Sequence, residues 1–293
     1  MKKLALLTLS YNDAHHILEL LESLKSSSYK DFDYLIFDND SKQSEAKEEL
    51  KKSTDVKFIQ NDKNLGFTGG VNKALEYVNS KYVLLLNSDI ILEEDTIKKL
   101  LDTIESDEKI AFVSAGIYDY NNKDKIASFG GKMNFFTGVG IPVRTRKNGI
   151  RELQYGEYTD ACCLIFNKKI FEELGRYDEK YFMYVETEDV EFKAMRNGYK
   201  VLIIPEAKVW HKVYGSNSGK KSRRAVYHLT RNRFLFIRKH VSTLQYSLFL
   251  ILNLFFILPV QFLLFVKRNQ TDLLSAFFIG IYDGLRQKHD RII

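Results

Sequence analysis

The chain has 293 residues, 45% of them hydrophobic and 28% charged, so it can bury a large core and is not expected to be disordered. Its formal net charge of +6 permits attraction to anionic phospholipid or to nucleotide diphosphates and selects neither. The two cysteines, Cys162 and Cys163, are adjacent in an apolar run, which excludes a disulfide framework and indicates small buried side chains in a reducing compartment. The apolar stretch near the N-terminus is too short for a secretory signal, so we expect a first strand and a protein that is not secreted.

Short apolar runs alternate with helical patterns over the first hundred residues. We expect strands over 4–9, 34–37, 56–59 and 82–86, helices over 14–25, 45–52 and 69–78, and a further helix that begins at Glu93. Such alternation predicts an α/β fold, in which helices cover both faces of a parallel sheet. Ligands of these sheets bind at the carboxyl ends of the strands.

Polar residues collect where the four expected strands end. Any one set could be turn or cap chemistry. Their convergence on one edge of a sheet is harder to explain in that way and favours a binding site. The sets are Ser10, Tyr11 and Asn12; Asp38, Asn39 and Asp40; Asn61 and Asn64; and Asn87, Ser88 and Asp89.

Asp89 is the most informative of these residues, because it closely follows the buried strand 82–86. A lone aspartate at such a position is often only a helix cap. A carboxylate at a ligand-binding edge also suits Mg²⁺ or Mn²⁺, which take oxygen ligands and let substrate phosphates complete the coordination shell. A second candidate ligand is His211, after a later short strand, although a lone histidine is more often structural.

The middle of the chain is less regular. Periodicity weakens from 118 to 157, as expected of hairpins, and returns with a strand over 158–167, a helix over 168–174 and a strand over 199–205. An acidic cluster lies between the last two elements. Carboxylates at the start of a helix are favoured by the helix dipole alone, but they are also candidates for proton transfer. The cluster consists of Glu186, Glu188, Asp189 and Glu191.

The C-terminal part of the chain changes character. The stretch 220–240 is basic and aromatic with helical spacing, whereas 243–266 carries no charged residue and is long enough to span a bilayer. Pro259 interrupts the apolar run, and both of its flanks are basic. We therefore expect a segment that enters and leaves the cytoplasmic leaflet, or an interfacial helix, rather than a simple span. A core helix or a helix at an oligomer interface is the alternative.

Several blocks of the sequence together resemble the family 2 glycosyltransferases with the GT-A fold, especially the rhamnosyltransferase-like branch. The blocks occur in the expected order over roughly residues 3 to 240, which is far more specific than any one motif. They are LSYND, FDNDS, NLGFTGGVN, LLNSD, the run 177–212 and LTRNRFLFIRKH.

The resemblance implies an inverting, metal-dependent transfer of a sugar from dTDP-rhamnose or a UDP-hexose to a lipid-linked or polysaccharide acceptor in cell-surface glycan synthesis. Together with the C-terminal residue pattern, it leads us to expect a catalytic domain over 1–217, followed by basic and apolar helices over 218–293 at the cytoplasmic face of the membrane. Homo-oligomers are compatible with this picture, and nucleic acid is not an expected partner.

The resemblance also implies roles for individual residues. Asn87, Ser88 and Asp89 match the family's variant of the DxD motif, in which the last Asp contacts Mg²⁺ or Mn²⁺, and His211 matches a second metal ligand. Gly66, Gly69 and Gly70 would let a loop approach the nucleotide sugar, with Asn72 on the helix that follows. The base and ribose would be held by Leu9, Ser10, Tyr11, Asp38 and Asn39.

The catalytic base is where the sequence departs from the family pattern. Counting back from the Gly198-Tyr199 pair places Thr187 where relatives have the Asp that serves as base, and threonine cannot do this. Asp189 and Glu188 are then the preferred candidates, ahead of Glu186. Asp160 is a second departure and would face the acceptor or merely begin a strand. The predicted catalytic residues are Asp189, Glu188 and Glu186, with Asp160 on the acceptor side.

Two other functions compete with this prediction. A sugar nucleotidyltransferase would need a glycine-rich, basic loop after the first strand to hold a triphosphate, and the chain has Ser10-Tyr11-Asn12-Asp13 there. A membrane-associated binding protein that keeps the fold but lost its base at Thr187 is the other alternative.

Overall fold

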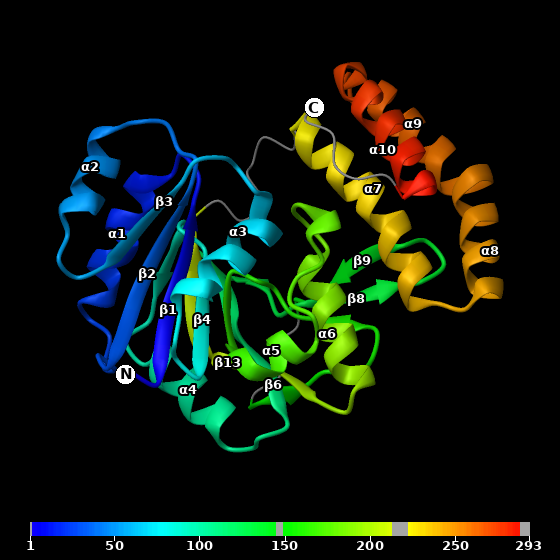
Figure 1. Ribbon diagram of the computed structural model, residues 1–293. Helices are drawn as coiled ribbons and strands as arrows, with labels where there is room; N and C mark the ends of the chain where they lie inside the picture. The colour runs from blue at the N-terminus through cyan, green and yellow to red at the C-terminus, as the bar shows by residue number, and fades with distance from the viewer. Residues whose placement is uncertain (1, 145–148, 213–221, 288–293) are drawn as a thin grey trace.

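The first four strands run parallel and form one side of a ten-stranded sheet in the computed structural model (Figure 1). The structure describes residues 2–144, 149–212 and 222–287. All four strands lie where the sequence predicts them, so their carboxyl ends share one edge of the sheet. From the outer edge inwards they are β3 (Lys57–Asn61), β2 (Phe32–Asn39), β1 (Leu4–Ser10) and β4 (Tyr82–Leu86).

The other side of the sheet mixes strand directions. Beyond β4 the strands are β12 (Cys163–Asn167), β6 (Ile110–Asp119), β13 (Lys200–His211) and β10 (Arg151–Glu152). β12 is antiparallel to both neighbours, whereas β13 is parallel to β6. The strand predicted over 199–205 therefore continues, through an irregularity between Ile204 and Lys208, and His211 is its last residue rather than a residue beyond it. β7 (Ile126–Ser128) pairs with β6.

Helices cover both faces of the sheet, as predicted. Alternate residues of β1 point to opposite faces, so Leu4 and Leu6 join one buried cluster while Ala5 and Leu7 join another. The first cluster is covered by α1 (Ala14–Leu24), α2 (Glu45–Lys52) and α4 (Thr96–Glu105). The second is covered by α3 (Gly66–Ala74), α5 (Lys168–Glu173) and α6 (Glu186–Arg196).

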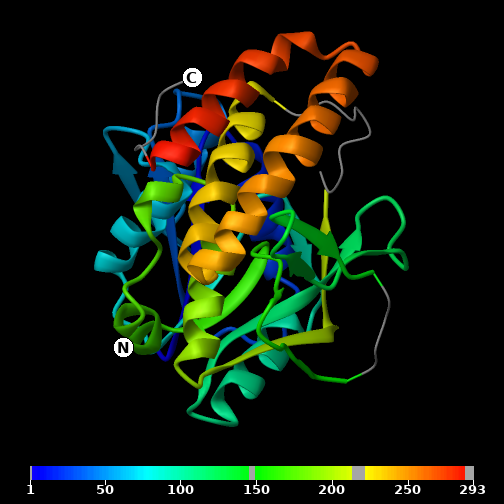
Figure 2. The ribbon, with the colours of Figure 1, turned by 90° about the vertical axis from the view of Figure 1, so that its right-hand side faces the viewer.

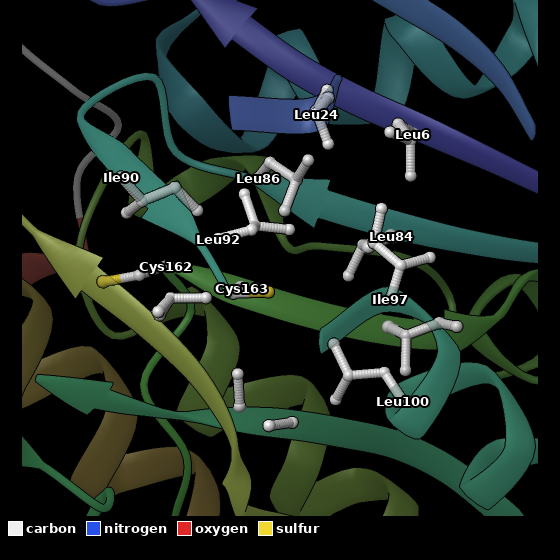
Figure 3. Close-up of a cluster of buried hydrophobic side chains, with 14 of the residues drawn as sticks. Leu6, Leu24, Leu84, Leu86, Ile90, Leu92, Ile97, Leu100, Cys162 and Cys163 are labelled. Atoms are coloured by element: carbon white, nitrogen blue, oxygen red, sulfur yellow. The ribbon is translucent and has the colours of Figure 1, made fainter. Parts of the chain in front are cut away.

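The chain forms a short extra strand, β5 (Ile90–Leu92), directly after Asp89, and α4 begins at Thr96 rather than at Glu93. Figure 3 shows Leu86 and Ile90 in the first cluster, near Cys163. Apolar anchors thus hold the chain on both sides of the polar residues 87–89. Both cysteines are buried and free, as the sequence predicts.

A small second sheet and the C-terminal helices lie together on one side of the molecule (Figures 1 and 2). The sheet contains β11 (Glu157–Tyr158), β8 (Gly131–Asn134) and β9 (Val139–Pro142). Gly280 and Gly284 let α10 approach α7 closely, because a Cβ at either position would lie 2.8 Å from a carbonyl oxygen of α7. The helices are α7 (Arg223–His240), α8 (Thr243–Leu252), α9 (Leu258–Lys267) and α10 (Leu274–Arg286).

α8 and α9 join through a π-helical turn, Asn253–Ile257, into one helix over Thr243–Lys267. Pro259 does not end this helix, because the wider turn directly before it accommodates the missing N–H. Among the described residues this helix is long and apolar enough to cross a membrane, and only 17% of its most apolar window is buried. A core helix of this chain is therefore the wrong interpretation. The predicted domain boundary at 217 lies outside the described residues.

Candidate active site

The pairing of β5 with β13 brings the two predicted metal ligands together. Ile90 lies opposite His211 in this antiparallel pair, and Asp89 directly precedes Ile90. As a result, Asp89 Oδ1 and His211 Nε2 are 3.3 Å apart. Burial disfavours the charged carboxylate, but the hydrogen bond and charge of His211 outweigh it, so the pKa of Asp89 lies below its usual value. The site therefore presents a carboxylate that is ionised at neutral pH.

This pair fits a divalent metal only if other ligands complete the shell. Within the described ranges, no group of three or more His, Cys, Asp or Glu side chains could hold a metal ion. One carboxylate oxygen and one imidazole nitrogen leave coordination positions for phosphate oxygens and water, which is how Mg²⁺ is commonly held beside a nucleotide. The pair is thus suited to a metal that arrives with its diphosphate.

Asp13 connects the ends of β1 and β4 and was not predicted as a site residue. It precedes α1, yet its side chain does not cap that helix. Its carboxylate instead accepts hydrogen bonds from Ser10 Oγ at 2.8 Å, from the Tyr11 N–H at 3.0 Å and from Ser88 Oγ at 2.5 Å. Asp13 therefore fixes Ser88, the residue next to Asp89. An aspartate three residues after Ser10 reads as turn chemistry in the sequence, so nothing distinguished it.

The end of β2 holds two predicted nucleotide-binding residues that make protein contacts. The Asp38 carboxylate lies 2.8 Å from Lys47 Nζ, and both side chains are almost fully buried. The Asn39 amide group organises the following loop: it donates to the Gly66 carbonyl at 2.9 Å and accepts from the Leu65 N–H at 2.9 Å. Nucleotide binding by this pair stays a prediction.

The predicted glycine-rich loop becomes the start of α3 and packs against protein. A Cβ on Gly70 would lie 2.6 Å from Leu9, and one on Gly66 would lie 2.6 Å from Phe182. Gly66 also has a φ of +73°, which favours glycine. These two glycines are thus required by close contacts within the chain, and their approach to a nucleotide sugar stays a prediction.

Other members of the predicted nucleotide site are placed as follows. Asn72 is engaged with the segment before α6, since its amide donates to the Tyr177 carbonyl at 2.9 Å. A Cβ on Gly69 would touch Leu65. The Asn87 side chain is half-buried, while its N–H donates to the Cys162 carbonyl at 2.9 Å.

Asp189, one of the two preferred bases, is surrounded by two lysines and two hydrogen-bonding side chains. Lys239 Nζ lies 2.8 Å and Lys193 Nζ lies 3.0 Å from Oδ2, and His240 Nε2 lies 2.7 Å from Oδ1. The Tyr181 hydroxyl donates to the same Oδ1 at 3.2 Å. Although burial opposes ionisation, these partners hold the pKa of Asp189 well below its usual range. This carboxylate is a weak base that ties α6 to the end of α7.

Glu188 has a different environment, because its side chain is only partly buried and lines a cavity. Burial and the charges of Asp160 and Asp189 raise the pKa of Glu188 to about 7. Glu186 is more deeply buried, and burial together with the Glu188 charge raises its pKa to about 8. A carboxylate that titrates near neutral pH is well matched to proton transfer.

Asp160 lies between the acidic cluster and the predicted metal ligand Asp89 in its electrostatic effects. Its charge raises the pKa of Glu188, and the charges of Asp160 and Asp89 both contribute to a raised pKa of the Cys162 thiol, which burial dominates. Cys162 Sγ lies 3.7 Å from Asp160 Oδ1. Asp160 therefore acts electrostatically on Glu188 on one side and on Cys162, which also senses the Asp89 charge, on the other.

The turn that leads into Glu186 is strained and is held by α7. Phe182, Tyr184 and Val185 all have positive φ values, of 62°, 69° and 73°, which are unusual for bulky or β-branched residues. The Asn232 amide donates to the carbonyls of Tyr181 at 3.0 Å and of Met183 and Tyr184 at 2.8 Å each. Asn232 is therefore a positioning residue for the acidic cluster. The sequence offered it only as part of the block LTRNRFLFIRKH.

A cavity of about 480 Å³ lies between the small sheet, the start of α6 and the C-terminal helices. The cavity lining is mainly apolar, and its charged side chains are Glu188, Arg233 and Arg268. Glu188 is the member of the acidic cluster that faces this space.

The sequence model "Glycosyl transferase family 2" matches residues 6–175, which is more than half of the chain and includes Asp89 and Asp160. The chain belongs to glycosyl transferase family 2. It is a glycosyltransferase with the GT-A fold, as predicted, and not a sugar nucleotidyltransferase.

Relatives of this family 2 glycosyltransferase are named as enzymes that transfer hexose or rhamnose. The low-salt glycan biosynthesis hexosyltransferase Agl10 of Haloferax volcanii is 24% identical over 66% of this chain and 65% of its own length. The N-acetylglucosaminyl-diphospho-decaprenol L-rhamnosyltransferase of Mycobacterium tuberculosis is 22% identical over 79% of this chain and 83% of its own. The chain thus spans just under two thirds of the first relative.

The fold of the family 2 glycosyltransferase also matches a solved structure. The mannosyltransferase PcManGT from Pyrobaculum calidifontis, in complex with GDP-Man and Mn²⁺, superposes with a TM-score of 0.63 at 12% identity, over 98% of this chain and 88% of that one. At this identity the likeness establishes the fold alone.

Proposed function

We propose that the protein transfers a sugar, with inversion, from a nucleotide diphosphate sugar to a lipid-linked acceptor at a membrane surface. dTDP-rhamnose or a UDP-hexose is the proposed donor. The observation that carries this proposal is the pairing of Asp89 with His211 at 3.3 Å, and a cavity-lining Glu188 whose pKa is raised to about 7 supports it. Inverting transfer requires a site that binds a metal ion with the donor diphosphate, and a general base whose pKa lies near neutral pH.

In the proposed reaction Glu188 accepts the proton of an acceptor hydroxyl while that oxygen attacks the anomeric carbon. The bond from the anomeric carbon to the diphosphate oxygen breaks, and its electron pair leaves with the nucleoside diphosphate. Asp89 and His211 would hold Mg²⁺ or Mn²⁺, which neutralises charge on a departing diphosphate. Asp189 keeps α6 against α7 through Lys239 and His240, so that Glu188 stays in place.

The acceptor class is supported by the position of the long apolar helix. Side chains of α9, including Leu264 and Phe265, line the cavity that contains Glu188. Other side chains of the same helix, such as Phe255 and Leu263, are more than half exposed. Part of this helix therefore lines the cavity, while its exposed apolar part is available to a membrane surface. This arrangement suits an acceptor whose lipid anchor stays in the bilayer. A polysaccharide acceptor would not need this arrangement.

The test of the proposed function is a donor screen with the full-length protein in detergent and Mn²⁺. We expect slow release of nucleoside diphosphate from one nucleotide sugar when water replaces the acceptor, and faster release with a polyprenyl-diphosphate sugar. If no donor in a broad panel is bound or turned over, the proposed function is wrong and the degenerate binding protein is favoured.

The rate of transfer should depend on the ionisation of Glu188. With a pKa of about 7, Glu188 is mostly protonated and inactive below that pH and mostly a carboxylate above it. We therefore expect kcat to rise about tenfold per pH unit below pH 7 and to level off above pH 7. The pH profile of kcat at saturating donor measures this, and a rate that is flat from pH 5 to 8 would contradict it.

Membrane attachment should depend on exposed apolar side chains of the long helix. Leu244, Ile251 and Phe255 are 73%, 51% and 70% exposed. Replacing all three with serine should weaken flotation with anionic lipid vesicles by at least about tenfold, since each side chain can contribute ~1.5 kcal/mol or more on burial. Serine at exposed Tyr77 and Ile150, on the catalytic part, is the matched control. Equal flotation of both variants would overturn the membrane assignment.

A further inference from the structure

The cavity beside Glu188 has a chemical character that the proposed transfer reaction does not by itself explain. Apolar side chains make up most of its wall, and two arginines are the cationic groups that line it. The wall is contributed by parts of the chain that are far apart in sequence, namely the small sheet, the start of α6, α7 and the segment from α9 to α10. Its lining includes Met133, Val139, Val226, Leu264, Phe265 and Phe277.

Arg233, on α7, is the unusual member of this wall. It is only 7% exposed, and its Nε and Nη2 atoms have no hydrogen-bond partner within the described residues. Its stem is held in place, because a Cβ on Gly138 would lie 2.5 Å from Arg233 Cγ, and its guanidinium carbon lies 5.5 Å from the centre of the Phe234 ring. Burial lowers the pKa of Arg233 to about 10, so the group remains charged at neutral pH.

A buried guanidinium without an anionic partner destabilises the folded chain, because desolvation of the charge is not compensated. The cost is offset if an anion occupies the cavity. Arg233 presents donors in a planar fork that matches phosphate oxygens, and Arg268 adds a second, exposed charge at the cavity wall.

We propose that this cavity binds the phosphate or diphosphate headgroup of an isoprenoid-type lipid, with Arg233 as its main anion contact. This inference deepens the proposed function, on which it rests for the identity of the acceptor. The apolar wall receives the first part of the lipid chain, and α9 continues that wall to the exposed apolar face. Glu188 lines the same cavity, so a sugar attached to the headgroup would have its hydroxyl near the base.

Calorimetric titration of the full-length protein in detergent tests this proposal, with EDTA present and no donor. The probes are farnesyl diphosphate, inorganic pyrophosphate and farnesol. EDTA removes the metal through which Asp89 and His211 could otherwise hold a diphosphate. We expect farnesyl diphosphate to bind at least about tenfold more tightly than either other probe, since it alone offers both the charge and the chain.

Arg233→Met keeps the packed stem and removes the charge, and it should weaken farnesyl diphosphate binding by at least about tenfold. Arg233→Lys should retain more of the affinity than the Met variant. Lys267→Met removes a positive charge at the end of α9, next to Arg268 but outside the cavity lining; it is the control and should bind like the wild type. The unfolding midpoint of Arg233→Met should be unchanged or higher, which excludes misfolding as the cause.

Unchanged binding of farnesyl diphosphate by Arg233→Met would overturn the proposal. Pyrophosphate binding equal to that of farnesyl diphosphate would also overturn it and assign the site to free phosphate compounds. Because this titration contains neither donor nor metal, it can fail while the wild type still turns over a nucleotide sugar. Failure of the headgroup site and failure of the transfer function are therefore distinguishable.

Discussion

Replacement of Glu188 by glutamine is expected to lower kcat by about 10² to 10⁴-fold, the usual contribution of a positioned general base, with little change in donor KM. Glutamine preserves the shape of the side chain and its place in the cavity wall but cannot accept the proton. Steady-state assays of sugar transfer at saturating acceptor measure this. The large effect is expected because no other carboxylate of the cluster both lines the cavity and titrates near pH 7.

Glu186→Gln and Asp189→Asn are the controls for the Glu188 variant. Glu186 is buried and does not line the cavity, so its glutamine variant should retain kcat within about tenfold of the wild type. Asp189→Asn should instead lower the thermal unfolding midpoint, because Lys193 and Lys239 lose their shared counterion and His240 loses a charged hydrogen-bond partner. A loss of kcat at Glu186 as large as at Glu188 would move the base to Glu186.

Replacement of Asp89 by asparagine should reduce metal-dependent donor turnover by at least about 100-fold. Loss of a residue that merely orients a ligand costs 10–100-fold in metal affinity or activity, and loss of the charged ligand itself should cost no less. Turnover against Mn²⁺ concentration, and calorimetry of Mn²⁺ in the presence of the nucleoside diphosphate, are the measurements. His211→Asn should show the same pattern with a smaller loss, since the carboxylate remains.

The matched control for Asp89 is Glu93→Gln. Glu93 lies just beyond β5 and pairs with Lys99 and Lys208, so its variant removes a nearby carboxylate without touching the Asp89–His211 pair. The dependence of donor turnover on Mn²⁺ concentration should be the same for this variant as for the wild type. If Asp89→Asn also leaves this dependence unchanged, the metal assignment must be abandoned.

Local patterns in the sequence were sufficient for the parallel half of the fold. Apolar runs and helical spacing located β1 to β4, and the polar residues after them predicted a shared edge. The Asp89–His211 contact could be anticipated only through the family resemblance, because it depends on an antiparallel pair between β5 and β13 that no local pattern encodes. The short strand Ile90–Leu92 was not among the expected elements.

Sequence patterns were less able to rank the carboxylates. Asp189 and Glu188 are neighbours in the chain, and what separates them is the arrival of Lys239 and His240 from the end of α7. The same limitation applies to the cavity, whose walls come from the small sheet, α6, α7 and the segment from α9 to α10, which are far apart in the sequence. Burial of an unpaired Arg233 is likewise a property of this assembly and not of its local sequence.

The dependence of the strained turn on Asn232 sets an order for how activity is acquired during synthesis. The carbonyls that Asn232 holds, from Tyr181 to Tyr184, are made 48 to 51 residues before it. A nascent chain that has emerged only as far as the end of β13 therefore lacks the side chain that holds this turn. We expect the segment that leads into Glu188 to reach its final conformation only after α7 has been synthesised.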